Sequence, residues 1–483
     1  MGPAGATQHL GLLALLIGLQ CMVCASSGPH IGVVGAGIGG AASAHWIRSL
    51  LGDQVQITVF ERSTSVGGRT STTPIGNASV DTAFDQVAHH SQYIRELADS
   101  QGLTVIGHIG VLPPAIFDGR SLVWAESPWW LVNLVKAVWR WGLNPWLLQR
   151  YSAQFWDRFS AVYELQTQGQ AYDSPEDLLR AAGVYDDSQV TLFEAVEAAL
   201  GEGGWGTDLF KTEVVGAITR GAYGQTSLQL NALSGAAALL AVTDPGGFSI
   251  EGGFPGLASA LLDSANASLH LGAEVRSIAR SPGSDRLQLA WADAAAGGGA
   301  AIAAQSGDFD GIILAAPLEG SQLDLAGVPD LAPRFPRSFV STVTTLVRGR
   351  VRASYFGQPA ATQLQYGRVL VTADSPVPFS SLAKVQLAPG QPSLWRLTSP
   401  KTLSHAWLSI VFEAGWQVAD ATTWAAYPRS DPPEDFSPFL LARGLWYNNA
   451  LESVAGSLEA AAMSALNTAL LVKRDVKARL DGT

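Results

Sequence analysis

The stretch IGVVGAGIGGAASAHW, residues 31–46, joins an apolar run to a helical pattern through closely spaced glycines. Residues 31–34 predict a buried strand and residues 41–51 predict a helix. Three glycines between them supply the pattern G-x-G-x-x-G of dinucleotide-binding folds: Gly35, Gly37 and Gly40. Such glycines let the turn tighten and let a pyrophosphate approach the backbone, while the helix N-terminus offers free N–H groups to the anion.

A second predicted strand, residues 55–59, leads to an acid that suits the two hydroxyls of a ribose, Glu61. NAD and FAD share these features, so the choice between them depends on the next residues, ERSTSVGGRT, 61–70. This segment resembles the flavin amine oxidase superfamily, which implies FAD. The cofactor-binding residues that it adds are Arg62, Gly67, Gly68 and Arg69.

Three later segments are expected to return to the nucleotide domain. In residues 249–263, Gly252 and Gly253 open a predicted helix, and a strand around residues 274–278 carries Val275 near the cofactor. Residues 312–314 predict another buried strand. The Ala-rich segment 445–471 is expected to be one amphipathic helix with Glu452 at its start, and its N-terminal end would face the flavin ring, where its dipole stabilises a reduced, anionic flavin.

The predicted fold is α/β, flavin amine oxidase-like, with a discontinuous Rossmann-type FAD-binding domain and an inserted α+β substrate domain. The expected FAD-binding domain comprises residues 28–92, 245–320 and 436–475. The substrate domain comprises residues 93–244, expected to be mainly helical, and 321–435, expected to be mixed.

The N-terminus predicts a secretory signal peptide, residues 1–25, because an apolar run is followed by small residues that suit cleavage after Ala25. This places the protein in a lysosome or vacuole, or outside the cell. Cys21 and Cys24 are the chain's only cysteines, and cleavage would remove both. The mature chain then has no disulfide, thiolate metal ligand or cysteinyl flavin link, so we expect non-covalent FAD and no metal. The sequons at Asn77 and Asn266 predict glycosylation.

A formal net charge of −11 argues against nucleic acid as a partner, and no protein partner is indicated. With 47% hydrophobic residues, the chain has ample material for a large core.

Beyond the flavin motifs, the chain resembles the prenylcysteine oxidases, including the plant-type farnesylcysteine lyases. The local stretches that carry the resemblance are VGAGIGGAASAHW, VGGRT, SPWWLVNLV, RGAYGQ, SIEGG, SYFG, WRLTSPK and LWYNNALE. The resemblance implies an FAD-dependent oxidase that uses oxygen and cleaves the thioether of a prenylcysteine to a prenal, free cysteine and hydrogen peroxide. Two rival interpretations stay open: an amine or carotenoid-type oxidoreductase, and a flavoprotein that binds prenyl lipids without turnover.

The segment 126–146 predicts a helix of about 14 residues, capped by Ser127 and ended by Gly142. It has a polar stripe (Asn133, Lys136 and Arg140) and an expected apolar face (Trp130, Leu134, Val138 and Trp141). A buried core helix is one interpretation. The alternative, in which Trp130 and Trp141 contact the substrate, is that the helix forms a wall of a prenyl channel or rests on a membrane.

Other site residues keep two interpretations each. Arg220 and Tyr223 either face the substrate, or Arg220 is buried against loop carbonyls. Trp395, Arg396 and Lys401 either hold the substrate carboxylate or form a solvated strand edge. The segment from Asp85 to His90 is shorter than the family pattern. His89-His90 are either substitutions near the flavin ring or surface residues, and we expect them at the surface. The catalytic residues stay unknown from sequence.

Overall fold

The computed structural model describes residues 28–76, 78–82, 87–107, 113–201, 203–243, 246–293, 305–319, 321–385 and 392–481. The predicted signal peptide, Asn77 and Asp85 lie outside these ranges.

The nucleotide-binding half is built on a six-stranded sheet whose central strands are parallel. In spatial order the strands are β20 (Leu440–Ala442), β21 (Leu445–Tyr447), β13 (Gly311–Leu314), β1 (His30–Val34), β2 (Gln56–Glu61) and β9 (Ser268–Leu271). Only the edge strand β20 runs antiparallel to its neighbour. The apolar runs predicted around residues 31, 57 and 312 are therefore three adjacent strands of this sheet.

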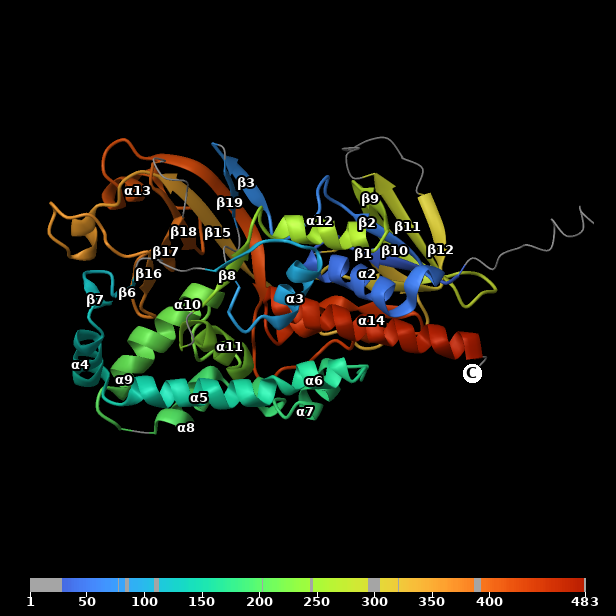
Figure 1. Ribbon diagram of the computed structural model, residues 1–483, viewed down its shortest axis with the longest axis horizontal. Helices are drawn as coiled ribbons and strands as arrows, with labels where there is room; N and C mark the ends of the chain where they lie inside the picture. Colours follow the sequence, from blue (N-terminus) through green and yellow to red (C-terminus); the bar gives the residue numbers. More distant parts are fainter. Residues whose placement is uncertain are drawn as a thin grey trace, which may run out of the picture.

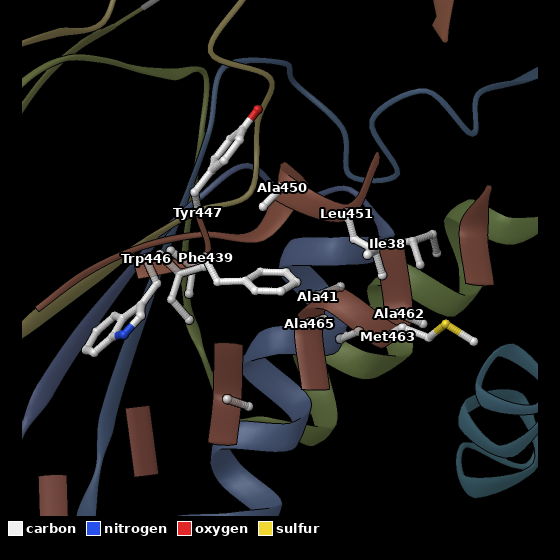
Figure 2. Close-up of a cluster of buried hydrophobic side chains, with 14 of the residues drawn as sticks. Ile38, Ala41, Phe439, Trp446, Tyr447, Ala450, Leu451, Ala462, Met463 and Ala465 are labelled. Atoms are coloured by element: carbon white, nitrogen blue, oxygen red, sulfur yellow. The ribbon is translucent and has the colours of Figure 1, made fainter. Parts of the chain in front are cut away.

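Helices α2 (Ile38–Leu51), α12 (Phe254–Ser264) and α14 (Leu458–Asp481) pack together beside this sheet (Figure 1). Figure 2 shows the contact between α2 and α14, where Ile38 and Ala41 lie near Ala462 and Ala465, with Leu451 above Ile38 and Phe439 pointing toward Ala41. The small alanines let the two helix backbones approach closely. Helix α3 (Gln92–Ser100) belongs to the same apolar core through Tyr93, Ile94, Leu97 and Ala98.

Smaller sheets complete this half of the molecule. A four-stranded sheet has the order β12 (Gln305–Phe309), β11 (Leu287–Asp293), β10 (Ala273–Arg280) and β14 (Asp324–Gly327). Two ribbons are formed by β3 (Thr72–Ile75) with β4 (Ala78–Asp81) and by β5 (Val105–Gly107) with β8 (Phe248–Ile250).

The other half is built on a seven-stranded sheet, antiparallel except where β16 meets β6. Its order is β19 (Gln417–Pro428), β15 (Phe339–Arg348), β18 (Leu394–Ser399), β17 (Ser381–Val385), β16 (Arg368–Val371), β6 (Pro114–Phe117) and β7 (Leu122–Ala125). The short helix α13 (His405–Val411) lies at the far end of this sheet from the nucleotide half (Figure 1).

A helical layer lies beneath this sheet and reaches under α14 (Figure 1). Its elements are α4 (Trp130–Trp141), α5 (Asn144–Phe159), α6 (Ala161–Thr167), α7 (Pro175–Ala181), α8 (Leu192–Leu200), α9 (Thr207–Phe210), the π-helical turn η3 (Lys211–Val215), α10 (Gly216–Tyr223) and α11 (Ala232–Thr243). No helix within the described ranges is both long and apolar enough to cross a membrane.

Two predicted helices differ from those observed. The segment 445–471 is strand β21, a 3-10 helix η5 (Asn448–Ser453) and then α14, so Glu452 precedes the last helix instead of starting it. Helix α4 begins at Trp130 because Ser127 is held outside it. The amide of Asn133 pairs with the backbone N–H and C=O of Ser127, and the backbone N–H of Trp129 donates to the Ser127 hydroxyl.

Candidate functional site

Two cavities meet at the start of α14. The smaller, about 500 Å³, lies at the carboxyl ends of β1, β2 and β13. The larger, about 570 Å³, lies between the seven-stranded sheet and helices α5, α10 and α11. Residues 456–458 line both cavities. The carboxyl edge of a parallel sheet is where such folds bind their ligands.

The glycine-rich turn forms the floor of the smaller cavity. Gly35 has φ +105°, and a Cβ on Gly40 would lie 1.9 Å from the carbonyl oxygen of Gly35, so this turn closes only without side chains. Gly40 does not line the cavity, and its role is to let α2 approach the strand. Gly67 donates its backbone N–H to the carbonyl of Ala36 at 2.9 Å, which brings the second glycine loop against the first. Gly35, Gly37, Gly67 and Gly68 therefore form one lining surface of bare backbone.

Glu61 is buried at the end of β2, with 8% of the residue exposed. Its two carboxylate oxygens accept hydrogen bonds from the backbone N–H groups of Ala36 and Ser63, both at 2.8 Å. A carboxylate offers about four acceptor positions, so capacity remains for two hydroxyl donors. Glu61 lines the smaller cavity, where the predicted ribose contact requires it.

A charged pair closes the opposite side of this cavity. Arg69 forms an ion pair with Glu452 and donates to the carbonyl of Ala426. Glu452 also accepts a hydrogen bond from the Asn449 side-chain amide at 2.8 Å. The other amide atom, Oδ1 of Asn449, is buried and has no hydrogen-bond partner within the described part of the chain. This acceptor lines the cavity and suits a ligand that carries a donor.

The first turn of α14 points toward the junction of the cavities. Ser457 caps the helix by accepting from the backbone N–H of Ala460 at 3.1 Å. The remaining first-turn N–H groups have no partner within the helix, so they give its N-terminus partial positive charge.

The other predicted cofactor contacts divide into two groups. Arg62 and Val275 line the smaller cavity. Gly252 and Gly253 lie outside it. Gly253 precedes α12 with φ +85°, and a Cβ there would lie 2.8 Å from Asp81 Oδ1. These two glycines shape the turn that sets α12 against α2, so their contribution to the cofactor site is indirect.

Comparison with known proteins gives a consistent result. The sequence profile described as "Prenylcysteine lyase" matches residues 124–482, and that of an NAD(P)-binding Rossmann-like domain matches residues 33–100. The chain belongs to the prenylcysteine lyase family. It is 31% identical to bovine prenylcysteine oxidase 1-like, covering 97% of this chain and 95% of that protein. It is 29% identical to rat prenylcysteine oxidase 1, covering 98% and 95%.

Solved structures confirm the predicted α/β fold class of this prenylcysteine lyase family member. Putrescine oxidase aligns with a TM-score of 0.60 at 14% identity, over 93% of this chain and 99% of that one. Cyclohexylamine oxidase from Brevibacterium oxydans aligns with a TM-score of 0.58 at 13% identity, over 93% and 100%. Together with the family, the cavity and the Rossmann-like domain, the fold makes this chain an FAD-dependent oxidoreductase.

In this prenylcysteine lyase family member, α10 presents Arg220 and Tyr223 to the larger cavity. The guanidinium of Arg220 donates to four backbone carbonyls of one loop at 2.7–3.0 Å, those of Thr372, Ser375, Val377 and Phe379. This is the loop-carbonyl interpretation, and it makes Arg220 a support for the cavity wall. Tyr223 packs edge-on against Tyr427, with ring centroids 5.0 Å apart.

The pattern Trp395-Arg396 alternates across a central strand, so the strand-edge interpretation is wrong for these two residues, although it fits the exposed Lys401. β18 lies between β15 and β17. Trp395 is buried in the core on one face, whereas Arg396 lines the larger cavity on the other and is 6% exposed. Arg368 lines the same cavity, and both arginines pair in register with Ala383. Lys401 is exposed and lines neither cavity.

The two adjacent histidines, His89 and His90, lie in different surroundings. His89 is exposed, as predicted, but His90 lines the larger cavity and packs against Trp156, with ring centroids 4.3 Å apart and the two rings tilted by 37°. The expectation that both lie at the surface was therefore wrong for His90. The chain turns inward there to begin α3, and the side chain follows it.

A carboxylate that sequence reasoning missed, Glu459, lines the larger cavity from the first turn of α14. It accepts hydrogen bonds from the backbone N–H groups of Tyr93 and Ile94 and from the Tyr163 hydroxyl, all at 2.8–3.0 Å. Burial raises the pKa of Glu459 to about 7. Its position after Ser457, in a first helical turn, was the available sequence signal.

The Trp-rich helix α4 lies outside both cavities. Trp130 is 70% exposed, and Trp141 is buried in a cluster with Trp124 and Phe210. The structure thus brings neither predicted tryptophan to the larger cavity. No cluster of three potential metal-ligating side chains occurs within the described ranges.

Proposed function

We propose that this protein cleaves the thioether of prenylcysteines oxidatively, with FAD as cofactor. Prenylcysteine, oxygen and water would give a prenal, free cysteine and hydrogen peroxide. The observation that carries the proposal is the junction, at residues 456–458, of the cavity lined by the glycine-rich turn with a largely apolar cavity, in a chain of this family.

The residues of the smaller cavity fit FAD. The bare backbone at Gly35, Gly37, Gly67 and Gly68 accommodates a pyrophosphate, Glu61 retains acceptor capacity for ribose hydroxyls, and Asn449 offers a buried acceptor. We propose that the flavin is held non-covalently, because removal of the predicted signal peptide leaves no cysteine for a thioether link to it. When bound, FAD supplies a two-electron acceptor for hydride, reoxidised by oxygen.

The larger cavity suits a prenyl chain with an amino-acid end. Phe155, Phe159, Leu240 and Met463 contribute an apolar lining. At roughly 0.8 kcal/mol per CH₂, a farnesyl chain of about fifteen carbons offers on the order of 10 kcal/mol of gross binding free energy. Arg396 gives the same cavity a buried cation, which is suited to the cysteine carboxylate.

The chain's part in the reaction is to bind and orient. The carbon that loses hydride is the prenyl carbon beside sulfur, because the sulfur lone pair and the allylic double bond both delocalise positive charge. Water adds to that carbon, and the resulting hemithioacetal breaks its C–S bond to give aldehyde and thiol. The apolar lining holds the prenyl chain while the polar end is fixed near Arg396.

We also propose a secretory location. The apolar leader of residues 1–25 supports it, and so does the second sequon. Asn266 is exposed in the turn after α12, as an oligosaccharide acceptor must be.

The test is anaerobic reduction of the purified flavoprotein by farnesylcysteine, monitored through the absorbance of the flavin. Loss of the oxidised-flavin band and, after oxygen is admitted, stoichiometric farnesal, cysteine and peroxide would support the proposal. Deuterium at the prenyl carbon beside sulfur should slow the reduction. Reduction by amines alone would favour an amine oxidase. Photoreduced flavin that reoxidises in air, but is never reduced by farnesylcysteine, would favour a binding protein without turnover.

A further inference from the structure

Exposed large apolar side chains are concentrated at one end of the molecule, around α4 (Figure 1). Five tryptophans and six aliphatic neighbours form what we call the Trp-rich patch: Trp129, Trp130, Leu131, Val132, Val135, Val138, Trp139, Leu143, Trp146, Trp205 and Leu209. Trp129, Trp139 and Trp205 are each 74–75% exposed. The Nε1–H of Trp205, two residues before α9, donates to the backbone carbonyl of Trp139 in α4 at 3.1 Å, which joins these segments into one surface.

Helix α4 is amphipathic in the reverse of the usual sense. Two of the three residues of the predicted polar stripe are turned inward: Arg140 pairs with buried Glu213, and Asn133 hydrogen-bonds the backbone of Ser127, whereas Lys136 is exposed. The opposite face, with Leu131, Val132, Val135, Val138 and Trp139, is the one exposed to solvent. The interpretation of α4 as a buried core helix is therefore wrong, because only its inner face is covered. A water-facing apolar surface of this kind marks an interaction site.

Charge distinguishes this region from the rest of the chain. Residues 127–156 contain three basic side chains and no acidic one, in a protein of formal net charge −11. Arg140 is neutralised by Glu213, whereas Lys136 and Arg150 are exposed beside the patch. Asp208, next to Leu209, lies 3.9 Å from the ammonium group of Lys211. Helices that pair tryptophan with basic residues rest in the headgroup layer of a bilayer.

We propose that the Trp-rich patch docks the protein on a lipid bilayer, with α4 lying in the plane of the headgroups. A 12-residue helix is about 18 Å long, less than the roughly 30 Å of the hydrocarbon core, so α4 lies on the membrane and does not cross it. Trp129, Trp130 and Trp139 enter the interface, and Lys136 and Arg150 meet anionic headgroups.

The experiment measures partition of the full chain onto vesicles of phosphatidylcholine, alone or mixed with phosphatidylserine. Wild type should co-sediment with both, and more strongly with the anionic mixture at low salt. The double variant Val135→Asp with Trp139→Asp should lower the partition coefficient about tenfold or more. Both positions are exposed, so the thermal unfolding midpoint and flavin spectrum should stay as in wild type.

Ile410→Asp is the matched control, because Ile410 is also an exposed apolar side chain on a helix, α13, away from the patch. It should leave partition unchanged. The pair Lys136→Gln with Arg150→Gln should abolish only the preference for anionic vesicles. Absence of wild-type binding to either vesicle, or equal binding by the Asp double variant, overturns the proposal. So does a wild-type dimer in sedimentation equilibrium that the double variant converts to monomer, because the patch would then bind a second copy. None of these measurements depends on enzyme turnover, so the membrane proposal can fail or succeed independently of the proposed reaction.

Discussion

Arg140 and Glu213 form a two-point ion pair that ties α4 to the π-helical turn before α10. Nε of Arg140 donates to one oxygen of Glu213 at 2.7 Å, and Nη2 donates to the other. The indole N–H of Trp141 donates to the same carboxylate at 2.9 Å. Because α10 lines the substrate cavity, this pair links the exposed helix to the cavity wall.

Glu213→Ala should destabilise the fold, although it changes none of the side chains that form the Trp-rich patch. Removing the carboxylate leaves the Trp141 N–H and a half-buried guanidinium without their partner, which should cost about 2–3 kcal/mol. Urea unfolding measures this change. The exposed pair of Glu176 and Arg180 provides the control, since Glu176→Ala should cost less than about 0.5 kcal/mol. Equal effects would show that the buried pair contributes no more than a surface one.

Glu61→Ala should weaken FAD binding because a charge-assisted contact with the ribose is lost. At roughly 1.5–3 kcal/mol, the dissociation constant should rise by one to two orders of magnitude. Titration of apoprotein by flavin fluorescence measures it. Arg62→Ala is the comparison, since Arg62 is exposed at the rim of the same cavity. Unchanged affinity for the Glu61 variant would remove that carboxylate from the cofactor site.

Ala383→Phe should fill the larger cavity between Arg368 and Arg396. Farnesylcysteine should then reduce the flavin at least about tenfold more slowly, because the side chain occupies volume that the prenyl group needs. FAD content and the absorbance spectrum should not change. Ala153→Phe, on the exposed face of α5, controls for the added aromatic ring. A normal rate in the Ala383 variant would place the substrate elsewhere.

Sequence predicted the nucleotide site because its signals are local. Gly35, Gly37 and Gly40 follow a strand directly, and Glu61 ends the next one, so residues near in sequence lie near in space. Asn449 and Glu452 complete the same cavity from the far end of the chain. Only the resemblance of their segment to a family motif pointed there, because nothing local in them predicts a contact with Arg69.

The larger cavity was less predictable because its lining comes from many separate elements. Arg396 is a cavity residue only because β18 is central in its sheet, a fact of strand order. The sequence left open which face of α4 is covered, because a core helix, a channel wall and a membrane-resting helix all fitted its pattern. The usual rule for a core helix places Asn133 and Arg140 in water. In the structure these two side chains face inward instead, because Asn133 pairs with the Ser127 backbone and Arg140 pairs with Glu213. Periodicity finds an amphipathic helix but not which of its faces is covered.

Glu459 should make stability fall as pH rises. Burial raises its folded-state pKa from 4.5 to about 7, although hydrogen bonds from Tyr93, Ile94 and Tyr163 oppose the shift. Between these two values the folded protein retains a proton that the unfolded chain has lost. The contribution to the free energy of unfolding is therefore complete below about pH 4.5 and is lost as the pH rises through about 7, an effect of up to about 3 kcal/mol.

Comparison of wild type with Glu459→Gln, by thermal unfolding from pH 5 to 8, isolates this effect. An amide in place of the carboxylate directs its NH₂ group toward a backbone N–H or the Tyr163 hydroxyl, so the variant should be less stable by about 1–3 kcal/mol at pH 5. Because Gln does not titrate, the difference should narrow as the pH rises and the buried carboxylate of the wild type ionises. Glu176→Gln, at a half-exposed position, should leave the wild-type profile unchanged. A constant gap between wild type and the Glu459 variant across this range would show that Glu459 acts only as a hydrogen-bond acceptor for α3.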